Sequence, residues 1–128
     1  IPKFRVWLPD IDQMLRVKAL VFEKDKTRCV CGYSFDFYLE DENATIMQST
    51  GLFDKNNKEI FEGDVVRQVR TQPITENETI TGVVTMLEGA WLIMNDCEQL
   101  ASFLWSETDE NEIIGNIYEN KGILEEEK

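Results

Sequence analysis

The chain has 128 residues, with 13 Lys and Arg against 25 Asp and Glu, and it contains no histidine. This length fits one domain, since single hydrophobic cores serve about 50–200 residues, and the 42% hydrophobic content is enough for such a core. The missing histidine excludes Ser-His and Cys-His nucleophile pairs and zinc sites with an imidazole ligand, and the net charge of −12 argues against general affinity for a phosphate backbone.

The first half of the chain alternates apolar and polar residues, which is the pattern of half-buried strands. Residues 4–8 and 15–21 show it on either side of the turn-forming residues 9–12, so a hairpin is predicted. The cleanest alternation extends from Cys29 to Leu39, with Gly32 inside it. It predicts one antiparallel strand with a buried face and a wet face, and a bulge at the glycine.

From residue 45 the pattern changes to short strands and tight turns. A strand at 45–48 is expected to end at Gly51, and polar turns follow at 54–58 and 62–64. The remaining strands are separated by a long polar loop and a Gly-containing turn, and they are predicted at 65–69, 80–87, 90–94 and 113–117.

A short helical segment is predicted before the last strand. Asn95 and Glu98 have capping-box spacing, and Leu100, Phe103 and Leu104 then follow at helical spacing. The resulting order of turns and strands is that of a small SH3-like barrel. The predicted fold class is therefore mainly β, in one compact unit: an N-terminal antiparallel hairpin or sheet over residues 1–48, an SH3-like β-barrel with a short helical turn over 49–118, and an acidic tail over 119–128.

Charge is divided unevenly along the chain. Residues 1–70 hold 11 basic and 12 acidic residues, whereas residues 71–128 hold 2 basic and 13 acidic ones. The first 39 residues are slightly basic, with 7 positive and 5 negative side chains. Opposite charge on two parts of one chain favours head-to-tail contacts between copies, so we expect a homo-oligomer.

The three cysteines, Cys29, Cys31 and Cys97, are expected to be free thiols. In a strand, Cys29 and Cys31 lie on one face two residues apart, which is a poor geometry for a disulfide. No apolar run approaches the ~18 residues that a bilayer span needs, and the first ten residues lack the apolar core of a signal peptide. We expect a soluble cytoplasmic protein with no membrane partner.

Residues 48–64 are the natural place to look for chemistry. The spacing of Asp54, Asn56 and Lys58 begins like a calcium loop, but lysine replaces an oxygen ligand at the third of these positions. Glu59 then stands where such a loop needs glycine, and Val65 stands where it needs a glutamate. The calcium interpretation fails on all three counts.

Glu62 and Asp64 leave two interpretations open. Two carboxylates at this spacing can hold a divalent ion or act as acid and base in a metal-dependent hydrolase. In the interpretation that we prefer, Asp64 accepts backbone N–H bonds in a turn, while Gly63 takes a conformation closed to other residues. We therefore predict no catalytic residue, no metal and no cofactor, and instead a structural turn motif made of Gly51, Asp54, Asn57, Glu62, Gly63 and Asp64.

The aromatic residues also allow two interpretations. Nucleobases stack on exposed rings in single-strand-binding barrels, whereas rings at core-facing periodicity fill a hydrophobic core. We favour the core for Trp7, Trp91, Trp105, Tyr33, Phe35 and Phe37. A separate acidic interaction surface is predicted at Glu107, Asp109, Glu110 and Glu112.

Four stretches together resemble the YopX family of bacteriophage and prophage proteins. They are KFRVW at 3–7, MQSTGLFD at 47–54, EIFEGDVV at 59–66 and EIIGNIYEN at 112–120. One departure is Asn57, which stands where the turn of the family usually has glycine; asparagine also tolerates positive φ, so the turn should survive. The resemblance implies a small, mainly β, phage-encoded protein that self-assembles, and it implies no reaction.

The function expected is that of a non-enzymatic phage or prophage accessory protein in the bacterial cytoplasm. It would act through self-assembly and through contacts with a host or phage protein. The alternative is an acidic DNA mimic, or another nucleic-acid-related regulatory module, directed at a host enzyme. Direct binding of nucleic acid is not expected, because the excess of carboxylates repels phosphate.

Overall fold

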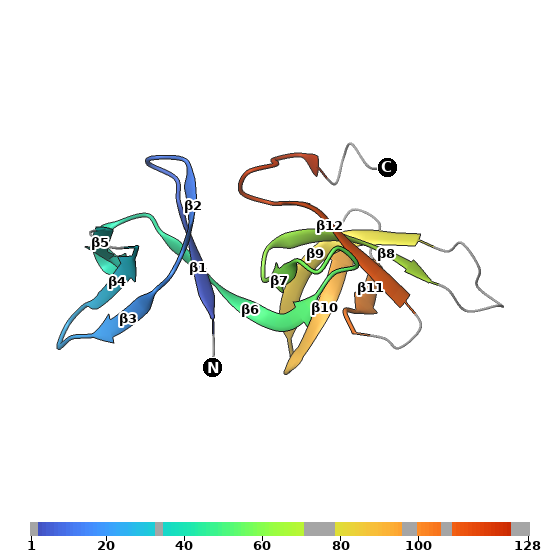
Figure 1. Ribbon diagram of the computed structural model, residues 1–128, viewed down its shortest axis with the longest axis horizontal. Coiled ribbons are helices and arrows are strands. Elements are labelled where there is room, and N and C mark those ends of the chain that lie inside the picture. Colours follow the sequence, from blue (N-terminus) through green and yellow to red (C-terminus); the bar gives the residue numbers. More distant parts are fainter. Residues whose placement is uncertain (1–2, 33–34, 71–78, 96–99, 106–108, 124–128) are drawn as a thin grey trace. The chain divides into compact units, whose positions relative to one another are not determined.

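Strands account for most of this computed structural model, which describes residues 3–32, 35–70, 79–95, 100–105 and 109–123. The mainly β fold class is thus confirmed (Figure 1). The chain divides into two compact units, unit 1 over Ile1–Ser49 and unit 2 over Thr50–Lys128. No helix in the described ranges is long and apolar enough to cross a membrane.

Unit 1 begins with the predicted hairpin. β1 (Phe4–Leu8) pairs antiparallel with β2 (Gln13–Arg16), with Val6 opposite Leu15. The predicted strand at 15–21 is interrupted, because Val17 and Lys18 separate β2 from β3 (Ala19–Phe22). On its other side β1 pairs with the first residues of β6 (Thr45–Phe53).

The predicted single strand from Cys29 to Leu39 is wrong. The segment forms β4 (Thr27–Cys31) and β5 (Phe35–Tyr38), an antiparallel pair with Cys31 opposite Phe35, and a short 3-10 turn, η1 (Leu39–Asp41), follows. Gly32 has φ +74° and lies at the end of β4, so it begins a reversal of the chain instead of a bulge. Residues opposite each other in an antiparallel pair point to the same face of the sheet. The alternation of apolar and polar residues therefore continues through the turn, and the pattern does not show where the first strand ends.

The core of unit 1 lies between β1 and the sheet β3-β4-β5. Val6, Cys29 and Cys31 are buried there, packed against half-buried hydrophobic side chains that include Leu15 and Phe37. The two thiols are free, with 3.8 Å between their Sγ atoms. Burial raises the pKa of Cys29 to about 12, with a smaller contribution from Cys31.

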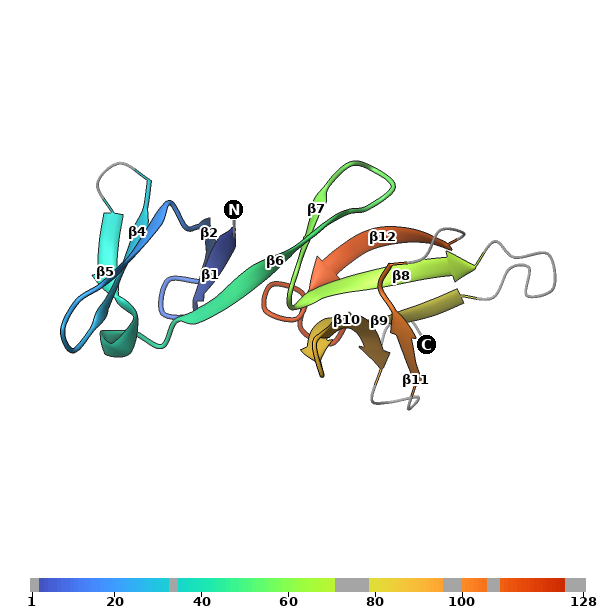
Figure 2. The same ribbon diagram turned by 90° about the horizontal axis from the view of Figure 1, so that it is seen from below.

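Unit 2 is built on a five-stranded antiparallel sheet in the order β11-β10-β9-β8-β12. Its strands are β8 (Asp64–Arg70), β9 (Thr79–Leu87), β10 (Ala90–Asn95), β11 (Leu100–Phe103) and β12 (Asp109–Asn116). Figure 2 shows the last strand, β12, beside β8, with which it pairs antiparallel. The SH3-like barrel stays a prediction.

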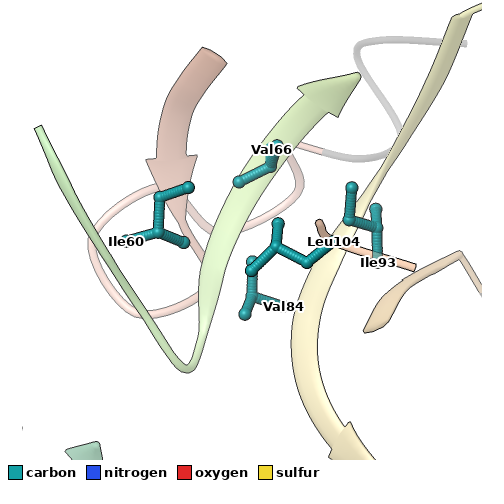
Figure 3. Close-up of a cluster of buried hydrophobic side chains, with 5 residues drawn as sticks. All are labelled: Ile60, Val66, Val84, Ile93 and Leu104. Carbon is teal, nitrogen blue, oxygen red and sulfur yellow. The ribbon is translucent and has the colours of Figure 1, made fainter. Parts of the chain in front are cut away.

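A cluster of buried aliphatic side chains holds the sheet of unit 2 together. β7 (Glu59–Phe61) contributes one of them, β8, β9 and β10 one each, and Leu104 follows directly after β11. Figure 3 shows these five side chains gathered from separate elements: Ile60, Val66, Val84, Ile93 and Leu104. Leu52, Trp91 and Ile113 are half-buried and pack against the cluster.

Two predictions for unit 2 are wrong in detail. β6 does not end at Gly51 but continues through it, at φ +78°, to Phe53. The predicted helical turn is a strand, since Leu100–Phe103 form β11 and pair with β10. The side-chain amide of Asn95 donates to the Thr81 carbonyl at 2.8 Å, so it serves the sheet; the rest of the predicted capping box, 96–99, lies outside the described residues.

The buried thiols lead to a first prediction, best tested in a Cys97→Ser background that leaves only Cys29 and Cys31. A raised thiol pKa keeps these side chains protonated at pH 8, and the protonated thiol is a poor nucleophile. We expect no reaction with an aromatic disulfide reagent at pH 8 in the folded protein, and modification of both thiols in denaturant. Rapid modification of the folded protein would contradict the burial.

Candidate functional site

The turn at 54–58 is organised by the carboxylate of Asp54, which is buried. Its Oδ1 accepts the N–H groups of Asn56 and Lys58 at 2.9 and 2.8 Å. Its Oδ2 accepts the N–H of Ile113 at 3.0 Å, from a strand 59 residues further along the chain. Asn57 completes the turn at φ 64°, the left-handed conformation that asparagine tolerates.

These contacts set the ionisation of Asp54. Burial alone would raise its pKa, but the donors from Ile113, Lys58 and Asn56 outweigh burial and lower the pKa below the ordinary value. The carboxylate is therefore charged at neutral pH and is fully engaged in holding the turn against β12.

The second turn, at 62–64, is organised in the same way. Asp64 is 2% exposed, and its Oδ2 accepts the N–H of Phe61 at 2.8 Å. Gly63 has φ +89°; it donates to the Val84 carbonyl and accepts from the N–H of Ile117. The turn thus ties the start of β8 to β9 and to the end of β12. Within the described residues, no group of three or more Cys, Asp and Glu side chains is placed to hold a metal ion.

The predicted acidic surface lies on β12 in part. Asp109, Glu110 and Glu112 belong to this strand, while Glu107 lies outside the described residues. The Glu112 carboxylate lies 3.6 Å from Lys55 Nζ and 3.6 Å from Arg67 Nη1, so neighbouring cations offset its charge. Glu110 is exposed.

The prediction that the aromatic side chains all lie in the core is wrong, and the exposed ones identify a candidate site. Trp7 is buried at 6% exposure and Trp91 is half-buried, but Trp105 is 62% exposed and Phe35 41% exposed. Tyr33 lies outside the described residues. Directly after β11 it is Leu104, and not Trp105, that enters the core, since Leu104 is fully buried in the aliphatic cluster.

A hollow of about 430 Å³ is formed beside Trp105, and sequence reasoning did not anticipate it. It is lined by Leu52, Ala90, Trp91, Phe103 and Trp105. Phe103 is 66% exposed, and Phe53, at the end of β6, is 54% exposed. The signal for it in the sequence is the run of three large apolar residues at 103–105, which cannot all point to one side of a strand.

A second, more polar hollow of about 430 Å³ shares Leu52 and Trp105 with the first. Its other lining residues come from the 54–58 turn, from Phe53 and Leu104, and from the start of β12: Asp54, Lys55, Asp109, Glu110 and Asn111. An aromatic end and an acidic end therefore adjoin on unit 2. We call the two hollows together the aromatic–acidic groove.

The buried side-chain amide of Gln68 holds the backbone of two residues that line this groove, Phe103 and Leu104. Gln68 is fully buried, and its Nε2 donates to the Phe103 and Leu104 carbonyls at 3.1 and 3.3 Å and to Asn111 Oδ1 at 3.0 Å. Its Oε1 accepts the hydroxyl of Ser102 at 2.9 Å. Asn111 Nδ2 closes the network by donating to the Leu104 carbonyl at 2.8 Å.

The chain is thus a mainly β protein of two units, with the aromatic–acidic groove on its second unit. The chain belongs to the YopX family: the family model described as YopX protein matches residues 3–125. This confirms the resemblance seen in the four sequence stretches.

Two solved structures share the fold. Protein yopX from Bacillus subtilis, known from a crystal structure, has 17% sequence identity to this chain. The two structures match with a TM-score of 0.65, over 92% of this chain and 94% of that chain. The crystal structure of protein EF1440 from Enterococcus faecalis is 24% identical, with a TM-score of 0.62 over 97% of this chain and 98% of that one. None of the curated proteins matches this sequence.

A second prediction concerns Asp54→Asn. The change removes a charged acceptor and turns one oxygen into a donor that faces backbone N–H groups, so it should lower the free energy of unfolding by about 2–3 kcal/mol. Since the folded pKa of Asp54 lies below its unfolded value, its contribution is complete above pH 3.8 and is lost as pH falls through the folded pKa.

Denaturant unfolding at pH 7 and at pH 3 measures both effects. At pH 3 the free energy of unfolding of Asp54→Asn should lie closer to that of the parent than at pH 7, because the parent has lost part of the contribution of the Asp54 charge. Glu88→Gln, an exposed change in unit 2, serves as the control and should follow the parent at both values. An undiminished difference between Asp54→Asn and the parent in acid would contradict the role of the charge.

A third prediction concerns Gln68→Leu, which keeps a similar volume but removes the amide that donates to the carbonyls of Phe103 and Leu104 and leaves the Leu104 carbonyl with Asn111 as its side-chain donor. Loss of buried hydrogen bonds should lower the free energy of unfolding by about 2–3 kcal/mol. Amide hydrogen exchange in 100–105 should also rise relative to the rest of the sheet. Gln13→Leu, exposed on β2, is the matched control; equal stability of the two variants would contradict the network.

Proposed function

We propose that this protein has no catalytic activity and acts through assembly with copies of itself and through contacts with other proteins. The proposal includes an accessory role for a bacteriophage or prophage in the bacterial cytoplasm, as the family resemblance implies. The observation that carries it is a set of large hydrophobic side chains left exposed in both units. These include Phe22, Ile11, Phe103, Trp105 and Phe53, at 81%, 53%, 66%, 62% and 54% exposure.

Such side chains are costly to leave in water, since burial of one is worth about 1.5–3 kcal/mol. Phe22 is the clearest case in unit 1, because it ends β3, one of the two outer strands of the three-stranded sheet. Edge strands that carry an exposed aromatic are places where another chain can add contacts.

The charges of the two units support contacts between unlike surfaces. Unit 1 contains 7 basic and 8 acidic residues, and unit 2 contains 6 basic and 17 acidic ones. Two copies of unit 2 repel each other, whereas unit 1 meets unit 2 without that penalty. This favours a heterologous, head-to-tail contact, which forms a ring when the rotation closes.

The DNA-mimic alternative is less well supported. A mimic needs carboxylates in an unbroken row at phosphate-like spacing, and on β12 the ion pairs of Glu112 with Lys55 and Arg67 interrupt such a row. The described acidic residues therefore favour a protein partner over the DNA site of an enzyme.

A fourth prediction tests the assembly. Sedimentation velocity at micromolar concentration should show species heavier than the 14.9 kDa monomer at low and at high salt, because the contact is apolar and unit 1, with 7 basic and 8 acidic residues, has no net attraction to unit 2 for salt to screen. Phe22→Ser should raise the monomer fraction because it removes the apolar contact, whereas the exposed change Thr79→Ser should not. A monomer under both salt conditions would contradict self-assembly.

A further inference from the structure

The aromatic–acidic groove on unit 2 selects a class of partner. We propose that it binds an extended peptide segment of a partner protein, in which arginine stands beside apolar residues. The inference rests on the proposed function and deepens it, since it names the chemistry of one protein contact.

The aromatic end supplies a platform for a guanidinium group. Phe103 and Trp105 flank the buried Leu104, and both rings are more than half exposed. Arginine stacks on such rings by cation–π attraction, worth about 0.5–1 kcal/mol at exposed sites and more when water is excluded. Trp91 and Leu52 add an apolar wall that fits the aliphatic neighbours of the arginine.

Arginine side chains and nucleobases can both stack on exposed rings. The charge at the acidic end therefore decides between a cationic peptide and a nucleic acid. Glu110 is exposed and lines the groove together with Asp109. Lys55, on the same rim, lies 3.6 Å from the Glu112 carboxylate, so much of its charge is already offset. In a unit with 17 acidic and 6 basic residues, this rim attracts a guanidinium and repels a phosphate backbone.

The backbone beneath the platform indicates how the segment is recognised. The carbonyls of Phe103 and Leu104 already accept hydrogen bonds from Gln68, and Leu104 also accepts from Asn111. A partner strand added at this point would have to compete with buried amides. The segment is therefore held by its side chains on a platform that is rigid before binding, which limits the entropy cost of the complex.

Fluorescence anisotropy with a defined probe tests the proposal. The probe is a fluorescein-labelled peptide, GSLRFRLSG, and its comparators are the peptide GSLEFELSG and a labelled short oligothymidylate. We expect the full-length protein to bind the arginine peptide, to bind it less well as salt is raised, and to bind neither comparator. Trp105→Ser and Glu110→Lys should each weaken binding about tenfold, since each removes one half of the recognition.

Matched controls lie in unit 1. Phe35→Ser removes another exposed ring, and Glu42→Lys makes the same charge change as Glu110→Lys. Both should leave binding within about twofold, because a surface change outside the groove removes none of its contacts. No binding of the arginine peptide, equal binding of the glutamate peptide, or unchanged binding by Trp105→Ser and Glu110→Lys would overturn the proposal. Preferential binding of oligothymidylate would assign the groove to nucleic acid instead.

Sedimentation of the same samples separates this inference from self-assembly. If the arginine peptide binds and leaves the sedimentation unchanged, the groove serves a separate partner. If the peptide dissociates the assembly, a second copy of this chain fills the groove and the assignment to a separate partner is overturned. Failure of peptide binding in a protein that still assembles would overturn the groove proposal alone.

Discussion

The side chain of Gln68 is the constraint on which the exposed surface of unit 2 depends. One buried amide joins β8 to β11, to Leu104 directly after it and to the start of β12 through four hydrogen bonds. An unpaired buried carbonyl costs more than a made hydrogen bond gains, so this network specifies where Phe103 and Trp105 emerge. Asp54 acts in the same way at the other rim, through its contacts with the 54–58 turn and with Ile113.

Local chemistry explains why much of the fold was predictable from the sequence. Turns at Asn57 and Gly63 depend on residues that tolerate positive φ, and such residues are visible in a single sequence. Buried and half-buried residues alternate along β9 around Val84, because one face of the strand packs in the aliphatic cluster, and the apolar run around Ile93 is equally visible. These signals do not depend on which distant element supplies the partner.

The failures have a common physical origin, because each needed a pairing partner to be known. The alternation from Cys29 to Phe37 is the same for one strand and for a hairpin closed at Gly32, and only the register of Cys31 with Phe35 separates the two. Leu100, Phe103 and Leu104 fit a helical spacing as well as a strand that pairs with β10. The prediction places Trp105 in the core on its spacing, although its neighbour Leu104 occupies the inward position.

The hydrogen bonds of Asp54 and Gln68 also constrain when unit 2 can complete its fold during synthesis. Asp54 accepts from the N–H of Ile113, 59 residues downstream. Gln68 donates to the carbonyls of Phe103 and Leu104, 35 and 36 residues downstream. Contacts so distant in sequence are slow to form, because the intervening chain must close a loop first. A nascent chain that stops before residue 109 contains both buried polar groups and lacks β12 entirely, so a message truncated there yields an aromatic surface that has lost the contacts of Gln68 with Asn111 and of Asp54 with Ile113.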